Sequence, residues 1–238
     1  MRHGHSIVAL IPALNEAESI SHVLRAMPRW VDQVIVVDNG SEDATASLAR
    51  ASGADVISEP RRGYGAACLR GLDAVQATDI ILFTDADYSD DLEQAAELVD
   101  PVAKGDADLV IGARASGLAE PGALSPHQRF GNGLACLLIR RIWGSSVSDL
   151  GPFRAIRAET LRKLAMHDHG YGWTIEMQIK AIQHNLEILE IPVTYRRRIG
   201  TSKISGTVSG SLKAGYTILK VLFSLALKER FSQLSAKF

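Results

Sequence analysis

The sequence predicts an α/β protein with a Rossmann-like, mostly parallel sheet that helices cover on both faces. Three observations support this prediction. Short runs rich in Val, Ile and Leu alternate with segments of helical spacing. The strand candidates are apolar almost throughout, as expected for strands that are buried on both faces. The chain has 238 residues, of which 46% are hydrophobic, and this is enough to build one large core.

In the first half of the chain, predicted strands and helices alternate regularly. The predicted strands are short and contain many β-branched residues; they cover 6–10, 34–37, 55–57 and 80–83. The helices between them carry apolar residues three and four positions apart; they cover 16–27, 45–52 and 65–76. This order is that of consecutive strand–helix units in a parallel sheet.

The second half is predicted to add more helices and two more strands. The strands are 109–112 and 187–195, and the helices are 92–99, 129–143, 159–166, 172–184 and 211–231. Two segments rich in Gly, Ser and other turn-forming residues, 115–126 and 200–210, are predicted loops. We therefore divide the chain into a domain at 1–210 and a C-terminal amphipathic helix with its tail at 211–238.

Composition excludes several classes of protein. The formal net charge of −1 lacks the basic excess of a general nucleic-acid-binding domain. No run of about eighteen apolar residues is present to span a membrane, and the first residues lack the pattern of a signal peptide. Cys68 and Cys136 form no Cys-x-x-Cys pair, so we expect buried thiols, as in a reducing compartment. These features predict a cytoplasmic protein.

Two acids follow the predicted strand 80–83. Asp85 and Asp87 are two positions apart, and in an extended backbone such side chains project to the same side. Carboxylates and substrate phosphates are the ligands that Mg²⁺ prefers, and ligands bind at the carboxyl ends of strands in open α/β sheets. This pattern predicts a site for Mg²⁺ or Mn²⁺, although an isolated Asp-x-Asp is also common in turns.

Loops with polar residues and glycines follow the other early strands. Asn15 is suited to cap a helix after the first strand, and Asp38 ends the second strand, where an acid can bind a ribose or base. Gly63 lies in an Arg-Gly-Tyr-Gly segment that opens a predicted helix, and helix amino termini attract phosphates. A capped turn without any ligand would explain Asn15 equally well.

Taken together, these segments resemble a known enzyme family. Pro-Ala-Leu-Asn-Glu at 12–16, Val-Asp-Asn-Gly-Ser-Glu-Asp-Ala-Thr at 37–45, Arg-Gly-Tyr-Gly-Ala-Ala at 62–67 and Asp-Ala-Asp at 85–87 resemble the inverting glycosyltransferases of family 2, which have the GT-A fold. The closer resemblance is to the dolichol-phosphate mannosyltransferase and polyprenyl-phosphate glycosyltransferase branch. It extends to 111–114, 149–154 and 198–203, and so covers roughly residues 6 to 205. Asn39, Tyr64 and Pro152 depart from the pattern common in the family.

The resemblance implies roles for individual residues. Contacts to the nucleotide-sugar are implied for Pro12, Ala13, Asn15, Glu16, Asp38, Gly63, Asp85, Ser202 and Lys203. Contacts to the acceptor are implied for Arg114, Arg129, Asn132 and Arg154, and catalytic roles for Asp87, Asp149 and Arg198. Asp85 and Asp87 would hold Mg²⁺ or Mn²⁺, which neutralises the leaving nucleoside diphosphate.

The expected activity is transfer of a hexose, with inversion, from a GDP-mannose or UDP-glucose type donor to a polyprenyl phosphate. One alternative is the same donor with a soluble hydroxyl acceptor, and another is a nucleotide-sugar-binding protein without catalysis. Asp149 would act as a base for a hydroxyl acceptor, whereas an ionised phosphate needs no strong base. Asp149 could equally well cap the turn before Pro152.

The predicted C-terminal helix is apolar, with Lys213, Lys220 and Lys228 on one side. Such a helix could lie in the interface of a membrane, which would make the protein peripheral at its inner face. It could equally pack on the sheet or across the interface of a homo-oligomer. The sequence does not decide between these arrangements.

Overall fold

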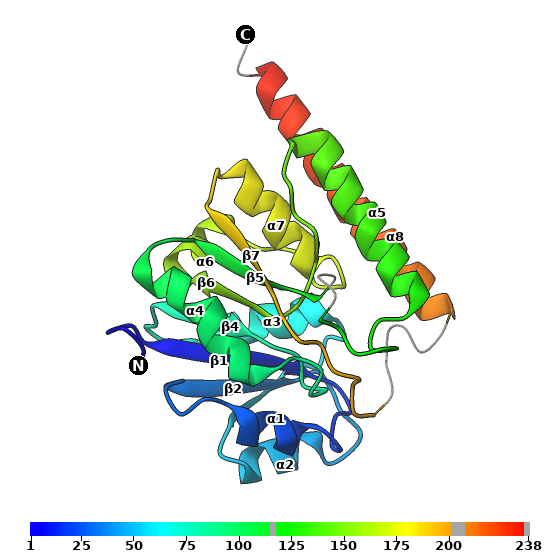
Figure 1. Cartoon of the computed structure of the whole chain (residues 1–238). Helices are drawn as coiled ribbons and strands as arrows, with labels where there is room; N and C mark the ends of the chain where they lie inside the picture. Colours follow the sequence, from blue (N-terminus) through cyan, green and yellow to red (C-terminus); the bar gives the residue numbers. More distant parts are fainter. Residues whose placement is uncertain (115–117, 201–207, 236–238) are drawn as a thin grey trace.

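The computed structural model contains one seven-stranded mixed sheet (Figure 1). The structure describes residues 1–114, 118–200 and 208–235, with the side chains of the last segment described from 215 to 231. The strand order is β3-β2-β1-β4-β6-β5-β7. The strands are β1 (Ile7–Ala13), β2 (Gln33–Asp38), β3 (Asp55–Ser58), β4 (Ile80–Phe83), β5 (Leu109–Ala113), β6 (Arg154–Arg157) and β7 (Ile188–Pro192).

Strand pairing is parallel everywhere except around β6, which runs antiparallel to both β4 and β5. Strand β6 was not predicted from the sequence. This strand has only four residues, Arg-Ala-Ile-Arg, and its charged ends resemble a loop. Its insertion between β4 and β5 depends on pairing with distant segments, which local residue patterns do not reveal.

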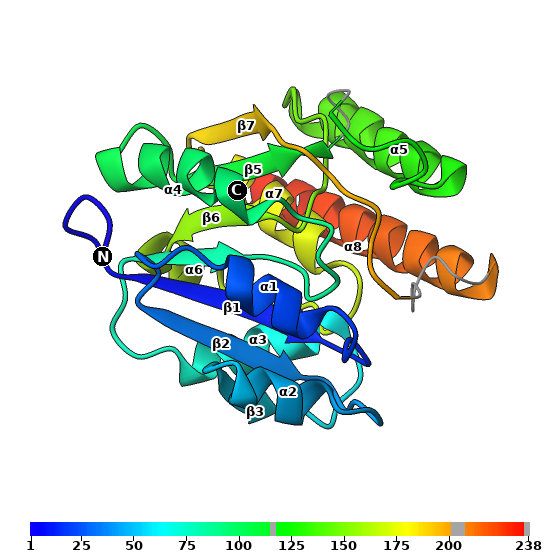
Figure 2. The same cartoon turned by 60° about the horizontal axis from the view of Figure 1, so that its bottom comes forward.

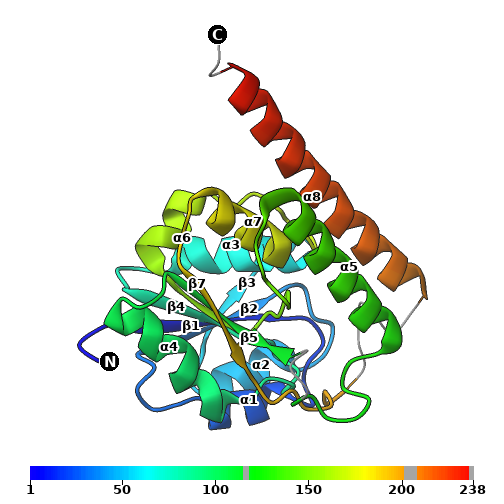
Figure 3. The same ribbon diagram turned by 45° about the horizontal axis from the view of Figure 1, so that its top comes forward.

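The helices form layers on the two faces of the sheet (Figure 3). One face packs against α1 (Ile20–Ala26), α2 (Thr45–Ala51) and α4 (Ala95–Lys104), which follows the short 3₁₀ helix η1 (Leu92–Gln94). The other face packs against α3 (Tyr64–Ala74), α6 (Ala158–Leu164) and α7 (Trp173–Gln183). Alternate residues of β1 enter the two cores: Ile7 and Ile11 one, Val8 and Leu10 the other. The predicted α/β fold with helices on both faces is therefore confirmed.

Two long helices lie side by side outside these layers (Figure 2). α5 (Pro126–Trp143) and α8 (Val208–Ser235) pack on each other and on α7. Ile139 of α5, Ile179 of α7 and Leu222 of α8 are fully buried where the three helices meet. No helix in the described part of the chain combines the length and the apolarity needed to cross a bilayer. The division of the chain at residue 210 remains a prediction.

Candidate active site

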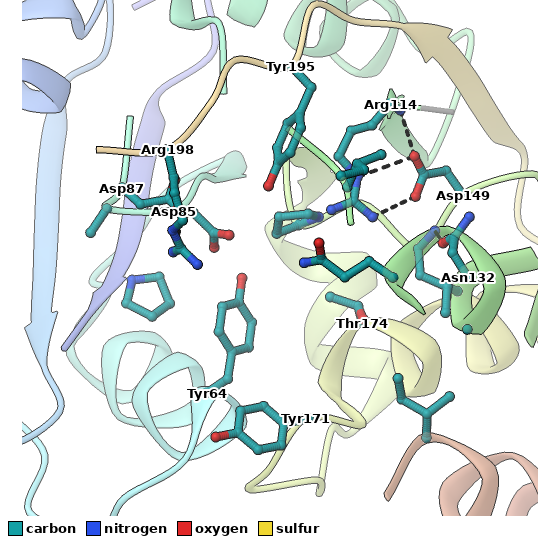
Figure 4. Close-up of a pocket in the computed structure, with 18 of the residues that line it drawn as sticks. Tyr64, Asp85, Asp87, Arg114, Asn132, Asp149, Tyr171, Thr174, Tyr195 and Arg198 are labelled. Carbon is teal, nitrogen blue, oxygen red and sulfur yellow. Dashed lines mark hydrogen bonds and ion pairs between the residues drawn. The ribbon is translucent and has the colours of Figure 1, made fainter. Parts of the chain in front are cut away.

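A cavity of about 970 Å³ opens at the carboxyl ends of β1 and β4 and extends to the start of α5 and α8. Figure 4 shows its two sides, with Asp85, Asp87 and Arg198 facing Arg114, Asp149 and Asn132 across an open space. Most of the residues predicted for the site line this cavity: Pro12, Ala13, Glu16, Gly63, Asp85, Asp87, Arg114, Arg129, Asn132, Asp149 and Arg198.

The loops that follow β1 and β2 are joined by hydrogen bonds. The backbone N–H of Asn15 donates to Ser41 Oγ at 2.9 Å, and Asn15 Oδ1 accepts from the N–H of Glu42 at 2.8 Å. Asn15 has a left-handed backbone with φ of 53°, which this side-chain bond helps to stabilise. Asp38 Oδ1 accepts from the N–H of Ser41 at 3.1 Å. Neither Asn15 nor Asp38 lines the cavity, and both shape the loops that form its edge.

Three carboxylates crowd the end of β4. Asp87 is 2% exposed, and its Oδ1 accepts from the N–H and the hydroxyl of Ser89 at 3.0 and 2.5 Å. Asp90 is also 2% exposed; its Oδ2 accepts from Thr84 Oγ1 at 2.9 Å and from the N–H of Asp85 at 3.0 Å. Burial raises the pKa of Asp90 to about 6. Burial and the negative charges of Asp87 and Asp90 raise the pKa of Asp85 well above its ordinary value.

Arg198 is the cation nearest to these acids in the described part of the chain. Its Nη2 is paired with Asp87 Oδ2 and lies 3.8 Å from Glu16 Oε1. The N–H of Ile199 donates to the carbonyl of Asp87 at 3.0 Å, so the backbone after β7 is held against the acidic loop. Arg198 Nε is buried and has no hydrogen-bond partner. The structure thus brings together two catalytic candidates that are 111 positions apart.

The acid pair fits a divalent cation that takes further ligands from a diphosphate. Asp85 and Asp87 line the same side of the cavity, and Asp90, which accepts from the N–H of Asp85, adds a third carboxylate beside them. The described residues contain no group of three or more His, Cys, Asp or Glu side chains placed to hold a metal. Two carboxylates with substrate phosphates are nevertheless a common arrangement for Mg²⁺.

At the start of α3, where the Arg-Gly-Tyr-Gly segment was expected to attract a phosphate, backbone N–H groups already have partners within the protein. The N–H groups of Gly65 and Ala66 donate to the carbonyls of Gly170 and His169 at 2.9 and 3.0 Å. The N–H of Gly63 donates to Asn39 Oδ1 at 2.8 Å. These donors are used within the protein. A side chain at Gly63 or Gly65 would collide with the backbone of 168–170, so packing explains both glycines.

On the opposite side, Arg114 and Asp149 form a buried ion pair. Asp149 Oδ2 accepts from the N–H of Arg114 at 2.6 Å, and Oδ1 accepts from Nη2 at 2.7 Å. The Arg114 guanidinium also lies over the ring of Tyr195, 5.2 Å from its centroid. Burial disfavours the Arg114 cation, but the Asp149 carboxylate outweighs this effect and raises the pKa of Arg114.

The loop that carries Asp149 is held by three separate elements. Asn132 of α5 donates to the carbonyl of Ser148 at 3.1 Å and accepts from the N–H of Leu150 at 2.9 Å. Gln178 of α7 donates to the carbonyl of Asp149 at 2.7 Å. The N–H of Asp149 donates to Glu190 of β7 at 3.1 Å. Asn132 was expected to contact the acceptor; these bonds make it a support for Asp149 as well.

Arg154 is placed differently from the prediction. It lies on β6, is 0% exposed and does not line the cavity. Its guanidinium donates to the carbonyls of Gly151 and Thr174, and burial lowers its pKa to about 10. We therefore correct its role from acceptor contact to support of the turn at Gly151. Ser202 and Lys203 lie outside the described residues.

Three residues of the site were not assigned a role from the sequence. Asp90 completes the acidic cluster, and its position five residues after Asp85 was the available signal. Tyr195 and Tyr64 project into the cavity from opposite sides (Figure 4). Tyr64 was noted only as a departure from the family pattern. Tyr195 forms isolated β-bridges with Asp90 and Ala119, which are distant in sequence, so no local signal marked it.

The chain matches the model of glycosyl transferase family 2 over residues 8–173. It belongs to this family. An uncharacterised glycosyltransferase of Mycobacterium tuberculosis is 36% identical over 222 residues, which are 92% of this chain and 99% of that protein. The polyprenol monophosphomannose synthase of Mycolicibacterium smegmatis is 31% identical over 230 residues, covering 87% of this chain and 84% of that protein.

Solved structures of similar proteins have the same fold. Glucosyl-3-phosphoglycerate synthase of Mycobacterium tuberculosis, in complex with Mn²⁺, UDP and glucosyl-3-phosphoglycerate, matches with a TM-score of 0.76 and 25% identity. The match covers 94% of this chain and 80% of that chain. The seven-stranded sheet and its helices are therefore a GT-A fold, as the sequence resemblance implied.

Proposed function

We propose that this family 2 protein transfers a hexose from a nucleoside diphosphate sugar to a polyprenyl phosphate, with inversion at the reacting carbon. The acid pair at the end of β4 would hold the donor diphosphate through Mg²⁺ or Mn²⁺. Related structures contain Mn²⁺ together with UDP, which supports this assignment. When bound, the cation would neutralise the charge that develops on the leaving diphosphate.

The two sides of the cavity suit an in-line displacement. One side of the cavity, which we call the donor side, contains Asp85, Asp87 and Arg198. The other, which we call the acceptor side, contains Arg114 and Asp149 (Figure 4). A sugar between them would have its leaving diphosphate on the first side and the acceptor on the second. The bond from the sugar carbon to the diphosphate oxygen breaks while an acceptor oxygen bonds the opposite face. This arrangement inverts the configuration in a single step.

The observation that carries the choice of acceptor is the contact between Arg114 and Asp149. Both carboxylate oxygens of Asp149 accept hydrogen bonds from Arg114. A hydroxyl acceptor needs a base, and its proton would compete with Arg114 for these oxygens. A phosphate acceptor is already ionised near neutral pH and brings a nucleophilic oxygen without proton transfer. Asp149 would then position Arg114 towards that phosphate.

The rest of the acceptor side also suits a lipid phosphate. Arg129 is exposed and lines the cavity at the start of α5, where it can meet an anionic group. Leu124, Leu150 and Ile218 contribute apolar surface to the cavity. The synthase of Mycolicibacterium smegmatis and the undecaprenyl-phosphate mannosyltransferase of Micrococcus luteus are named for polyprenyl substrates, which supports the same class here.

A small phosphorylated acceptor is the second candidate. It is favoured by the related structures of glucosyl-3-phosphoglycerate synthase, which contain phosphoglyceric acid. The same side chains could bind the phosphate of either acceptor. The two candidates differ in the attacking atom, because a phosphoglycerate would accept the sugar on a hydroxyl, whereas a polyprenyl phosphate would accept it on a phosphate oxygen. A non-catalytic binding protein would not require the paired Arg114 and Asp149 opposite the donor side.

The test is a donor screen followed by an acceptor screen. GDP-mannose and UDP-glucose are first ranked by the rise in melting temperature that each produces with Mn²⁺, because a ligand of the folded state stabilises it by mass action. The best donor, carrying a labelled sugar, is then incubated with a short polyprenyl phosphate in detergent or with 3-phosphoglycerate. Label on the polyprenyl phosphate supports the proposal. Label only on the soluble phosphate overturns the lipid acceptor, and no transfer to either overturns the activity.

A further inference from the structure

We propose that α5 and α8 together form a surface that binds an anionic lipid bilayer. The inference complements the proposed lipid acceptor, but it rests on the outward faces of these helices rather than on the catalytic residues. Its experiment uses vesicles without acceptor or donor, so it can fail independently of the proposed activity.

Large apolar side chains are exposed along both helices. Their exposed fractions run from 50% to 72%, at positions spaced four and seven apart; they are Phe130 and Leu137 of α5, and Tyr216, Phe223, Leu227 and Phe231 of α8. Single exposed apolar residues are common on protein surfaces, whereas a group on two adjacent helices indicates a binding surface. We call these six residues the apolar face.

The apolar face points away from the rest of the molecule. The opposite sides of the two helices are buried against α7, where Ile139, Ile179 and Leu222 meet. Because α5 and α8 lie next to each other on α7, their outward sides share one side of the protein (Figures 1 and 2). Glu229 of α8 accepts from Trp143 Nε1 and from Gln183 Nε2 at 2.9 Å, which holds this arrangement of the three helices.

Charge identifies the occupant. Within α5 and α8 there are seven Lys and Arg residues and one acid, Glu229, whereas the whole chain carries a net charge of −1. Arg141 of α5 and Lys220 and Lys228 of α8 are exposed beside the apolar face. Two copies of such a surface would repel each other. An anionic bilayer attracts the cations and accepts the apolar side chains in its interface.

The cavity reaches the helix ends that carry Phe130 and Tyr216. Gly131 and Gly133 of α5 and Gly215 and Ile218 of α8 line the cavity, and they are close in sequence to Phe130 and Tyr216. Both helices begin at the cavity end of the molecule and run in the same direction (Figure 1). A bilayer against the apolar face would therefore place lipid headgroups beside the acceptor side of the site.

The experiment is flotation of the full chain with vesicles of phosphatidylcholine, alone or mixed with phosphatidylglycerol. We expect binding to the anionic vesicles and little binding to the neutral ones. Phe223→Ser with Leu227→Ser should reduce the partition coefficient by at least about tenfold, because these side chains lose their apolar contact. Lys220→Gln should reduce it about fivefold.

Matched controls keep the test specific. Leu189→Ser removes an exposed apolar side chain from β7, and Lys104→Gln removes an exposed cation from α4; both should bind vesicles like the unchanged protein. Circular dichroism checks that each variant is folded. The proposal is overturned if the unchanged protein stays in solution with both vesicle types, or binds both equally. It is also overturned if the variant with both Phe223→Ser and Leu227→Ser binds vesicles normally. The same holds if sedimentation shows that these two substitutions only dissociate an oligomer.

Discussion

The two sides of the cavity differ in how their charges are balanced. On the donor side, three acids lie close together at the end of one strand: Asp85, Asp87 and Asp90. Among the described residues, Arg198 is the cation paired with this group, through Asp87. On the acceptor side, Arg114 and Asp149 form a matched pair in which charge is balanced within the protein. The donor side therefore has more acidic groups than cations, whereas the charges of the acceptor side are already paired and fixed in position. The difference suggests that the donor side changes when ligand binds and that the acceptor side stays rigid.

The largest effect is expected on the donor side. Asp87→Ala should lower kcat/KM for the donor by at least about a thousandfold, which corresponds to about 4 kcal/mol in the transition state. The variant removes a proposed cation ligand and also the nearer of the two carboxylates beside Arg198. Calorimetry with GDP or UDP and Mn²⁺ should show no metal-dependent binding. Asp106→Asn, at an exposed acid after α4, is the control. Nucleotide binding that persists unchanged in a chelator would refute the role of the acid pair.

On the acceptor side, the expected effect is on stability as well as activity. Arg114→Met should lower the free energy of unfolding by about 3 kcal/mol, because it leaves the buried Asp149 carboxylate without its cation. Replacing both residues, by Arg114→Met and Asp149→Leu, should recover part of this loss. Urea denaturation measures both effects. Donor binding should remain intact in the single variant. A double variant that is less stable than the single one would contradict the account.

The pH dependence of stability tests the crowding of acids. Between about pH 4 and pH 6, the folded protein holds a proton on Asp90 that the unfolded chain has released, because burial raises the pKa of Asp90 to about 6. The free energy of unfolding should therefore fall as the pH rises through this window, by about 2 kcal/mol. Asp90→Asn should flatten the profile there and be the more stable protein above pH 6. Parallel profiles for the two proteins would show that Asp90 does not titrate in this way.

The smallest effect distinguishes the two arginines. Arg198 competes with a cation for Asp87, so Arg198→Ala should increase the affinity for Mn²⁺ without nucleotide by about fivefold. The same variant should weaken binding of the complete donor, since its guanidinium is proposed to meet the diphosphate. Arg114→Lys, on the rigid side, should leave the Mn²⁺ affinity unchanged. Titration of Mn²⁺ followed by electron paramagnetic resonance gives both values. Equal Mn²⁺ affinity in Arg198→Ala and the unchanged protein would argue against the competition.

Much of the donor side could be predicted from the sequence. Asp85 and Asp87 follow a strand that local composition identifies, and parallel strands bring their carboxyl ends to one edge. The alternating strands and helices predicted the α/β class for the same reason, since apolar periodicity is a local property of the chain. The motifs after β1, β2 and β4 are each contiguous, so their resemblance to family 2 was visible without any long-range contact.

Tertiary structure alone decided the rest. The pairing of Arg114 with Asp149, the insertion of β6 and the burial of Arg154 join segments far apart in sequence, and residue patterns do not specify such partners. The α3 amino terminus looked suited to phosphate, but 168–170 supplies its acceptors in the folded protein. The predicted C-terminal helix was recognised as apolar and cationic, but only packing on α7 established that α5 lies beside it and shares its outward side. Residue types and their local spacing can be read from the sequence. Which distant side chains contact each other depends on the surfaces that the whole fold brings together.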